Sequence, residues 1–356
     1  MSASVIVLII YLAVIFGIGL YNGRAGVKNE EDYYLGDRSF GPLPTAISMG
    51  ATDSSGWIFI GAIGYAYLAG PVSFWMYPGF AVLIAKLGGW GAFWSQAVAI
   101  DPVMGTLTGG AAGSAAVGVI LGLLFYGLGE FGQPHILQRF FSAKDDNTLK
   151  YGTIVSSLWM IGVMCGSSIL GCLARVYIDG LEDAEYAFPT LVNQMMPAVV
   201  SGIVVGAIFA AVQSTFSSQL LVAVQAVASN IIKPLSKREY SDSELVKIGK
   251  ITMVVLCVLS TAIALLNIDS VFSLVVYAWS GLASAFGPLC ILLIYRPHKV
   301  NRGSAVAGMI VGLVVSTAWY MAGLGVWCME LVPGMIVSWL VIEAVGSVFS
   351  RRERKI

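Results

Sequence analysis

An aspartate lies within one of the apolar runs of this sequence, in the string Ser48-Met49-Gly50-Ala51-Thr52-Asp53-Ser54-Ser55-Gly56-Trp57. A carboxylate inside a membrane span is costly unless it faces a cation or a polar cavity. The small and hydroxyl residues around Asp53 allow a helix to unwind, and the carbonyls freed in this way are suited to coordinating Na⁺. The alternative is an aspartate that caps a helix close to the membrane interface, since Asp53 lies in the first half of its span. Because intramembrane acids are usually functional, the first interpretation is favoured.

A second polar cluster lies in the middle of the apolar run 197–232. Its side chains are hydroxyls and amides, namely Gln213, Ser214, Thr215, Ser217, Ser218 and Gln219. Hydroxyl and carbonyl oxygens are suitable ligands for a hard cation. The alternative is a polar seam between helices, in which each hydroxyl bonds to the backbone of its own helix. The cluster by itself does not decide between the two.

A third string combines glycines, a proline and polar groups within the apolar run 115–137. It reads Tyr126-Gly127-Leu128-Gly129-Glu130-Phe131-Gly132-Gln133-Pro134-His135. This composition predicts a discontinuous helix that lines a cavity, with Glu130 as a second intramembrane acid. A kinked packing helix with polar residues at its inner end is the open alternative. His135 and His298 are the only histidines in the sequence, so we expect no transition-metal site.

The elements that carry these strings are predicted membrane helices. The 356 residues are 57% hydrophobic and only 11% charged, whereas a soluble domain carries about 25% charged residues. The 20 basic and 20 acidic residues balance, which gives no reason to expect a nucleic-acid partner. A span needs about 20 mostly apolar residues. Nine runs qualify: 4–22, 42–70, 115–137, 152–176, 197–232, 246–266, 270–294, 303–323 and 331–349. We therefore predict an all-α polytopic protein with one transmembrane domain, 1–356, embedded in a lipid bilayer.

Basic residues predict the orientation of these spans, because they favour cytoplasmic loops. They gather in 23–40, 138–151, 233–250, 296–302 and the C-terminal tail, whereas 179–185 holds only acidic charges. This pattern places the C-terminus in the cytoplasm and the N-terminus outside. Such an orientation requires an odd number of crossings, so the tenth apolar stretch, 71–90, does not fit as a further regular span. Its prolines and glycines also argue against a through-going helix.

The ordered motifs resemble the sodium:solute symporter family, most of all its sodium/proline symporter branch. The matching strings, which extend over nearly the whole chain, are Asp32-Tyr33-Tyr34-Leu35-Gly36, Arg38-Ser39-Phe40-Gly41-Pro42, Gly50 to Trp57, Phe131 to Leu137, Ser214 to Leu221, Tyr277-Ala278-Trp279 and Ala285-Phe286-Gly287-Pro288. The resemblance implies a LeuT-type inverted-repeat fold in the cell membrane of a bacterium. It also implies Na⁺-coupled amino-acid transport.

The resemblance also implies roles for particular residues. It gives a Na⁺ site made by the carbonyls of Ala51, Ser54 and Ala211 and the hydroxyls of Ser214 and Thr215. It makes Asp53 and Ser55 coupling residues beside that site. Substrate-binding positions correspond to Trp57, Tyr126, Glu130 and Pro134.

Two features depart from the family pattern. Glu130 stands where the proline branch has an aromatic residue. Family members are also longer, and the chain passes from the 77–80 region directly to Leu87-Gly88-Gly89-Trp90, which indicates an internal deletion near 77–88 and a partial fold. The sequence therefore predicts symport of a small organic solute, proline or a related amino acid, together with Na⁺. The alternative is a remnant of such a symporter that is regulatory or does not transport.

Overall fold

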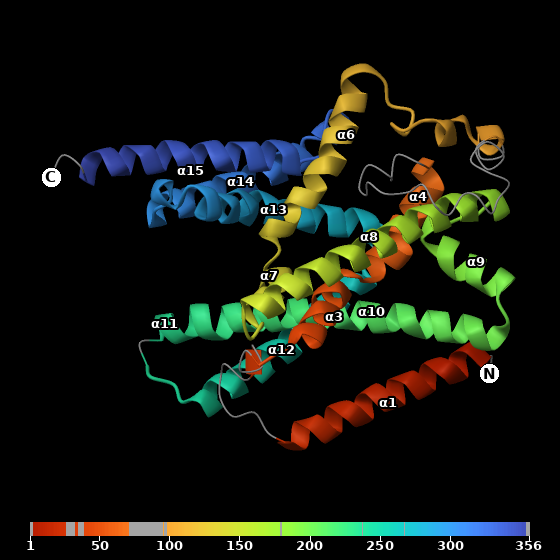
Figure 1. The fold of residues 1–356 in the computed structure, drawn as a ribbon, viewed down its shortest axis with the longest axis horizontal. Coiled ribbons are helices and arrows are strands. Elements are labelled where there is room, and N and C mark those ends of the chain that lie inside the picture. Colours follow the sequence, from red (N-terminus) through yellow and green to blue (C-terminus); the bar gives the residue numbers. More distant parts are fainter. Residues whose placement is uncertain are drawn as a thin grey trace. The chain divides into compact units, whose positions relative to one another are not determined.

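Helices make up nearly all of the part of the chain that can be described. The computed structural model describes residues 3–25, 33–34, 39–70, 95, 98–178, 180–236, 238–266 and 268–353 (Figure 1). The apolar stretch 71–90, with the predicted deletion junction at 77–88, lies outside the described residues. Among the residues that are described, Phe40 and Ala143 form an isolated parallel bridge.

The protein is a polytopic α-helical membrane protein, as the sequence predicts. Seven of the described helices are long and apolar enough to cross a membrane. They are Gly113–Gly132, Asp146–Tyr177, Ala198–Leu235, Asp242–Leu265, Val271–Tyr295, Arg302–Met321 and Leu331–Val348. Two shorter apolar helices, Val5–Tyr21 and Trp57–Ala69, coincide with the remaining predicted spans. Such helices satisfy their backbone polar groups internally, which lipid cannot do.

Three of the spans depart from a regular α-helix. The first polar string lies on α3 (Pro42–Asp53), a π-helical segment η2 (Trp57–Ala62) and α4 (Ile63–Ala69). The string around Glu130 lies on α6 (Gly113–Leu128), a 3₁₀ turn η6 (Gly129–Gly132) and α7 (Pro134–Phe141). The hydroxyl-rich string lies on α10 (Ala198–Gln225), which continues as a π-helical segment η8 (Ala226–Ile232) and α11 (Lys233–Leu235). Departures of this kind are common at functional sites.

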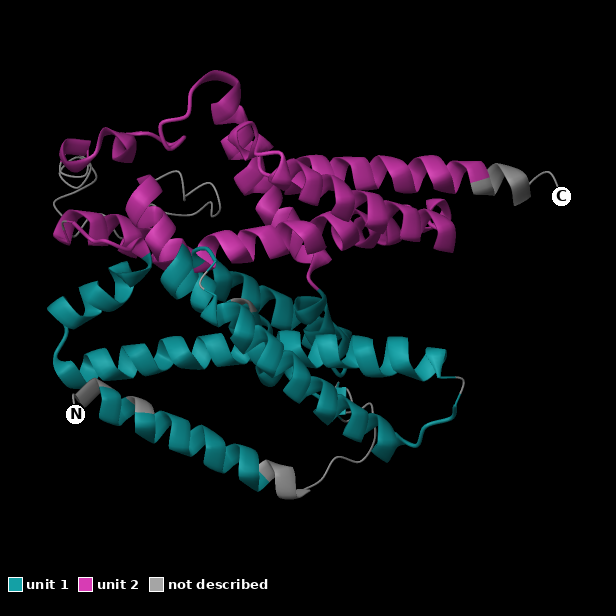
Figure 2. Cartoon of the chain, turned by 180° about the vertical axis from the view of Figure 1, so that it is seen from behind, with its two compact units in different colours: residues 1–61, 134–163, 185–270 teal, residues 62–133, 164–184, 271–356 magenta. Residues whose placement is uncertain are grey.

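The chain divides into two compact units, and each is assembled from three separated segments (Figure 2). Unit 1 contains residues 1–61, 134–163 and 185–270, and unit 2 contains 62–133, 164–184 and 271–356. Unit 1 includes α1 (Ala3–Ala25), α3, α7, the first half of α8 (Asp146–Tyr177), α9 (Ala187–Met195), α10 and α12 (Asp242–Leu265). Unit 2 includes α4, α6, the second half of α8, and the helices α13 (Val271–Tyr295), α14 (Arg302–Met321) and α15 (Leu331–Glu353).

Small residues hold the last three helices of unit 2 together. Helices α13, α14 and α15 lie side by side (Figure 1), and they contact one another pairwise. Ser284 of α13, Ser316 of α14 and Ser338 of α15 are all fully buried within this bundle. Membrane helices associate through close packing of small side chains, since lipid gives apolar surfaces little reason to leave it. This bundle carries Trp279 and thereby supports the turn η6.

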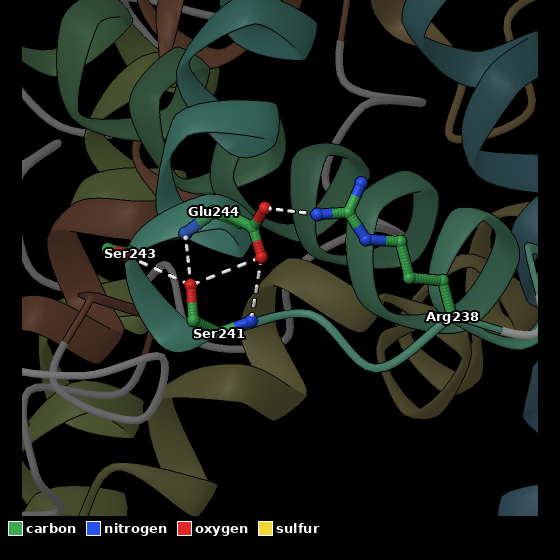
Figure 3. Close-up of polar contacts among 4 residues, drawn as sticks. All are labelled: Arg238, Ser241, Ser243 and Glu244. Atoms are coloured by element: carbon green, nitrogen blue, oxygen red, sulfur yellow. Dashed lines mark hydrogen bonds and ion pairs between the residues drawn. The ribbon is translucent and has the colours of Figure 1, made fainter.

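Polar side chains accept free backbone N–H groups at the N-termini of α8 and α12, at positions that lie outside the apolar runs. Asp145, directly before α8, accepts the N–H of Thr148 at 2.8 Å, and this hydrogen bond holds the pKa of the Asp145 carboxyl below its usual range. Before α12, the Ser241 hydroxyl accepts the N–H of Glu244 at 3.4 Å, and the Glu244 carboxylate accepts the N–H of Ser241 at 3.0 Å (Figure 3). Arg238 pairs with Glu244 at 2.6 Å. This reciprocal capping box fixes where α12 begins.

Replacing the capping serine tests this boundary. Ser241→Ala removes the acceptor for the N–H of Glu244, and loss of such a cap costs about 1 kcal/mol. We expect amides in the first turn of α12 to exchange about fivefold faster in a nanodisc hydrogen-exchange measurement. Ser243→Ala is the matched control, because its hydroxyl contacts only the Ser241 side chain among the bonds of Figure 3. Equal exchange in the two variants would contradict the cap.

Candidate functional site

The first polar string interrupts its helix at two serines. Helix α3 ends at Asp53, Ser54 is extended with φ −76° and ψ 93°, and the chain becomes helical again as η2 from Trp57. The Ser54 N–H bonds to the carbonyl of Gly50 at 3.1 Å, and the Ser55 hydroxyl accepts the N–H of Trp57 at 3.4 Å. Serine side chains that bond to nearby backbone compete in this way with helix continuation. The structure thus contains the unwound segment that the small residues favour.

A side chain of α10 bonds to a carbonyl in the last turn of the interrupted helix α3. In a continuous α-helix the carbonyl of Thr52 would accept the N–H of Gly56. Here the Thr215 hydroxyl donates to that carbonyl at 2.6 Å, and both threonines are buried. The first polar string and the hydroxyl-rich string, more than 150 residues apart in sequence, therefore contact each other within unit 1 through oxygen atoms.

A glycine makes this close approach of α10 to the break feasible. A Cβ at Gly56 would lie 2.9 Å from Cγ2 of Val212, which is closer than carbon atoms pack. Val212 lies one turn before Thr215 on α10, so the same approach brings the Thr215 hydroxyl to the Thr52 carbonyl. The glycine in the string is thus a packing requirement of the site.

Further side chains complete the polar surroundings of the break. The indole N–H of Trp159, on α8, donates to the Ser54 hydroxyl at 3.0 Å. The Thr52 and Ser218 hydroxyls lie 3.3 Å apart, and Arg139 of α7 donates to both. The sequence reasoning missed Trp159 as a site residue and counted Arg139 only as a cytoplasmic charge. The signal for Arg139 was its place on the polar face of the short helix after Pro134, close in sequence to a broken span.

The predicted Na⁺ and coupling residues all lie in unit 1. Ala51, Asp53, Ser54 and Ser55 lie at or next to the end of α3, and Ala211, Ser214 and Thr215 lie on α10. The predicted solute residues are divided between the units. Trp57 and Pro134 belong to unit 1, and Tyr126 and Glu130 belong to unit 2. A common solute pocket for these four residues stays a prediction.

In unit 2, the turn η6 is fixed against helix α13. The Tyr126 ring stacks on Trp279 with centroids 5.0 Å apart, and the Trp279 indole donates to the carbonyl of Tyr126 at 3.3 Å. The buried Gln133 amide donates to the carbonyls of Gly129 at 3.4 Å and Trp279 at 3.3 Å. Trp279, one of the aromatics in the predicted span 270–294, thus serves to hold this turn.

The second interruption follows directly after that turn. Gln133 has extended φ −97° and ψ 104°, and helix α7 starts at Pro134. Proline suits the first position of a helix, where its missing N–H has no intrahelical partner to lose. Of the two interpretations of this span, the discontinuous helix is the one that the structure contains; whether it lines a cavity stays a prediction.

Residues 78–312 match the sequence pattern of the sodium:solute symporter family. The chain belongs to this family. The osmoregulated proline transporter OpuE of Bacillus subtilis (strain 168) is 34% identical over 249 residues, which cover 68% of this chain but only 50% of that protein. The sodium/proline symporter of Escherichia coli (strain K12) is 26% identical over 464 positions, which cover 94% and 92% of the two chains.

The longer alignment bears on chain length. Its 464 positions exceed the 356 residues of this symporter-family chain, so it includes positions that this chain lacks.

The fold is similar to that of a Na⁺-coupled sialic acid symporter in its substrate-bound outward-open state, with a TM-score of 0.71, 19% identity and 98% coverage of both chains. The fold is therefore of the LeuT type, as predicted. The relatives are named as transporters, in agreement with the expectation that the chain is not an enzyme.

Two glycines of the string around Glu130 offer a matched test of the η6 packing. A Cβ at Gly132 would lie 2.7 Å from Cα of Ala283 and 2.8 Å from the carbonyl of Leu282, whereas a Cβ at Gly127 would meet nothing within 4 Å. Because the neighbours of Gly132 are backbone atoms, Gly132→Ala forces α13 and η6 apart. Overpacking of this kind costs about 1–3 kcal/mol.

We expect Gly132→Ala to lower the unfolding temperature in detergent by several degrees. Gly127→Ala should leave it unchanged or raise it slightly, since alanine favours the helix. Fluorescence-detected size-exclusion chromatography after heating gives the measurement. Equal stability of the two variants would show that η6 is not packed against α13 in this way.

Proposed function

We propose that the protein couples the movement of Na⁺ to symport of a small organic solute, proline or a related amino acid, by alternating access. The observation that carries this proposal is the bond from the Thr215 hydroxyl to the Thr52 carbonyl at the break in α3. Irregular backbone at membrane depth is tolerated where it is enclosed by protein or lines a cavity, and in transporters it holds ions and solutes. The family membership and the proline-transporter relatives support the same direction.

The oxygen atoms around the break suit Na⁺. Ala211, Ser214 and Thr215 are spaced so that they share one face of α10, and the Thr215 hydroxyl already reaches the end of α3. The C-terminal end of α3 offers carbonyls that the helix leaves free and a partial negative charge. We assign the Na⁺ ligands to the carbonyls of Ala51, Ser54 and Ala211 and the hydroxyls of Ser214 and Thr215. Na⁺ here is a transported ion.

Asp53 and Ser55 are proposed to couple Na⁺ to solute. Asp53 is the last residue of α3, and Ser55 lies inside the break, where its hydroxyl meets the first N–H of η2. Na⁺ bound on one side of the break and solute bound beyond it would therefore both fix the same few backbone dihedrals. Coupling of this kind is reciprocal: if Na⁺ tightens solute binding, solute tightens Na⁺ binding by the same factor.

The solute is proposed to contact Trp57, Tyr126, Glu130 and Pro134. Trp57 starts η2 directly after the break, Tyr126 lies near the end of α6, and Glu130 lies within the turn η6. A carboxylate among aromatic side chains suits a solute with an ammonium group, and an amino acid provides one.

We place the protein in a bacterial cell membrane with the N-terminus outside and the C-terminus in the cytoplasm, and we regard the chain as one transport domain.

The second candidate is a regulatory or non-transporting remnant of such a symporter. It is favoured by the alignment positions that this chain lacks. Uptake of radiolabelled proline into proteoliposomes, with and without an inward Na⁺ gradient, separates the two candidates. Gradient-driven accumulation supports symport, whereas Na⁺-dependent binding without accumulation supports the remnant.

The proposed Na⁺ site is tested by Thr215→Ala and Asp53→Asn. Thr215→Ala removes a buried hydroxyl, which costs about 1–3 kcal/mol, and Asp53→Asn removes a negative charge beside the proposed cation. We therefore expect the Na⁺ concentration for half-maximal solute binding to rise about tenfold or more in both variants. Ser217→Ala, two residues further along α10, should have no effect, because its exposed hydroxyl bonds only to the Ser214 carbonyl of its own helix. Unchanged Na⁺ dependence in the Thr215 and Asp53 variants would remove the site assignment.

Glu130→Gln tests the role of the intramembrane acid. If the carboxylate binds the ammonium group of the solute, the variant should bind proline about tenfold more weakly at saturating Na⁺, since charge-assisted bonds are about twice as strong as neutral ones. Its Na⁺ affinity without solute should stay unchanged. Glu182→Gln, in the acidic loop, is the control for charge removal. Loss of Na⁺ affinity in place of solute affinity would make Glu130 a cation ligand.

A further inference from the structure

The guanidinium of Arg139 is held at the same oxygen-rich junction as the proposed Na⁺ site. Its short helix α7 is fixed to the segment that precedes α3. The Gln138 amide donates to the carbonyl of Tyr34 at 3.1 Å, and the N–H of Lys144 donates to the carbonyl of Phe40 at 3.2 Å. These bonds orient the helix, and its one arginine reaches inward to α3 and α10.

Arg139 bridges the two helices that carry the proposed ligands. Its Nε donates to the Thr52 hydroxyl at 3.1 Å, and a terminal nitrogen donates to the Ser218 hydroxyl. Thr52 belongs to the last turn of α3, and its carbonyl is the one bound by Thr215. Ser218 lies one turn beyond Ser214 and Thr215 on α10. The guanidinium therefore sits within about one helical turn of the proposed ligands.

The protons at this junction leave oxygen lone pairs for a cation. The Ser218 hydroxyl donates to the carbonyl of Ser214 at 2.9 Å, so in its contact with Thr52, 3.3 Å away, the Thr52 hydroxyl is the donor. Both hydroxyls then offer lone pairs to Arg139. The guanidinium is thus held by neutral oxygens of the same chemical class that we assign to Na⁺.

Two positive charges at this junction oppose each other. Arginine stays protonated in proteins, and residues one turn apart on a helix lie about 5–6 Å from each other. At that distance, away from bulk solvent, repulsion between unit charges is substantial and is little screened by salt. Na⁺ bound at Ser214 and Thr215 would therefore favour withdrawal of the guanidinium.

We propose that Arg139 is an internal competitor of Na⁺, which occupies the junction of α3 and α10 in the Na⁺-free protein and leaves it when Na⁺ binds. The proposal rests on the Na⁺ site assigned above. Withdrawal of the guanidinium breaks the hydrogen bonds from Arg139 to Thr52 of α3 and Ser218 of α10. Na⁺ binding would therefore change whether α7 is hydrogen-bonded to α3 and α10 at this junction. Na⁺ affects a conformational equilibrium only through such a difference between the two states.

The test measures Na⁺ affinity without solute. Na⁺ is titrated into detergent-purified protein at constant ionic strength, with choline as the replacing cation, and the rise in unfolding temperature gives the apparent Kd. Arg139→Gln removes the charge and keeps hydrogen-bonding groups, so we expect an apparent Kd for Na⁺ about tenfold lower. A purely structural arginine would give the opposite change, because its loss would disorder the site and weaken Na⁺ binding.

Two further variants complete the test. Lys144→Gln removes an exposed positive charge five residues away and should leave the Kd unchanged. Ser218→Ala removes one acceptor of the guanidinium, and we expect it to lower the Kd about threefold. This variant also tests the competition between Arg139 and Na⁺ if Arg139→Gln does not fold. An unchanged or higher Kd in both Arg139→Gln and Ser218→Ala, with a Na⁺ response in the wild type, overturns the Arg139 proposal alone. Absence of a Na⁺ response in the wild type and in every variant overturns the proposed function as well.

Discussion

The hydrogen bond from the Thr215 hydroxyl to the Thr52 carbonyl is the contact on which the described site depends. A helix that stops inside an apolar span leaves carbonyls without partners, and each such group is costly where water is absent. Thr215 satisfies one of them from another helix. This arrangement allows α3 to end at Asp53 and still remain buried, and it leaves oxygens of two helices facing the same place.

The rest of unit 1 is arranged around that ending. Gly56 allows α10 to approach, and Trp159 of α8 bonds to the Ser54 hydroxyl, so α8 and α10 both contact the end of α3. The chain resumes in the wider π-helical turn of η2, which changes the direction of the side chains that follow. A cation bound here would be held by backbone that is already bent and would need little further rearrangement.

The turn η6 of unit 2 shows a different solution to the same constraint. There, the interruption is stabilised by the stacked pair of Tyr126 and Trp279 and by the Gln133 amide, which bonds to two carbonyls. Aromatic packing fixes the geometry of the turn, and one buried amide bonds to a carbonyl of the turn and to a carbonyl of α13. The two interrupted spans thus use different chemistry, hydroxyl groups in one and an aromatic–amide pair in the other.

The sequence by itself determined the membrane class, the family, the apolar runs that form the described membrane helices and the positions of both interruptions. These properties depend on apolar run length and on local clusters of small and hydroxyl residues, which act over a few neighbouring residues. Only the tertiary structure decided that Thr215 meets Thr52 and that Arg139 and Trp159 belong to the site. The local sequence places Arg139 on the polar face of a short helix but does not indicate its partners or those of Trp159, because these contacts join residues about 80 to 160 positions apart through helix packing. Arg139 illustrates the limit: as a lone basic residue near a span end it predicts a cytoplasmic loop, and its bonds depend on how α7 lies against α3 and α10.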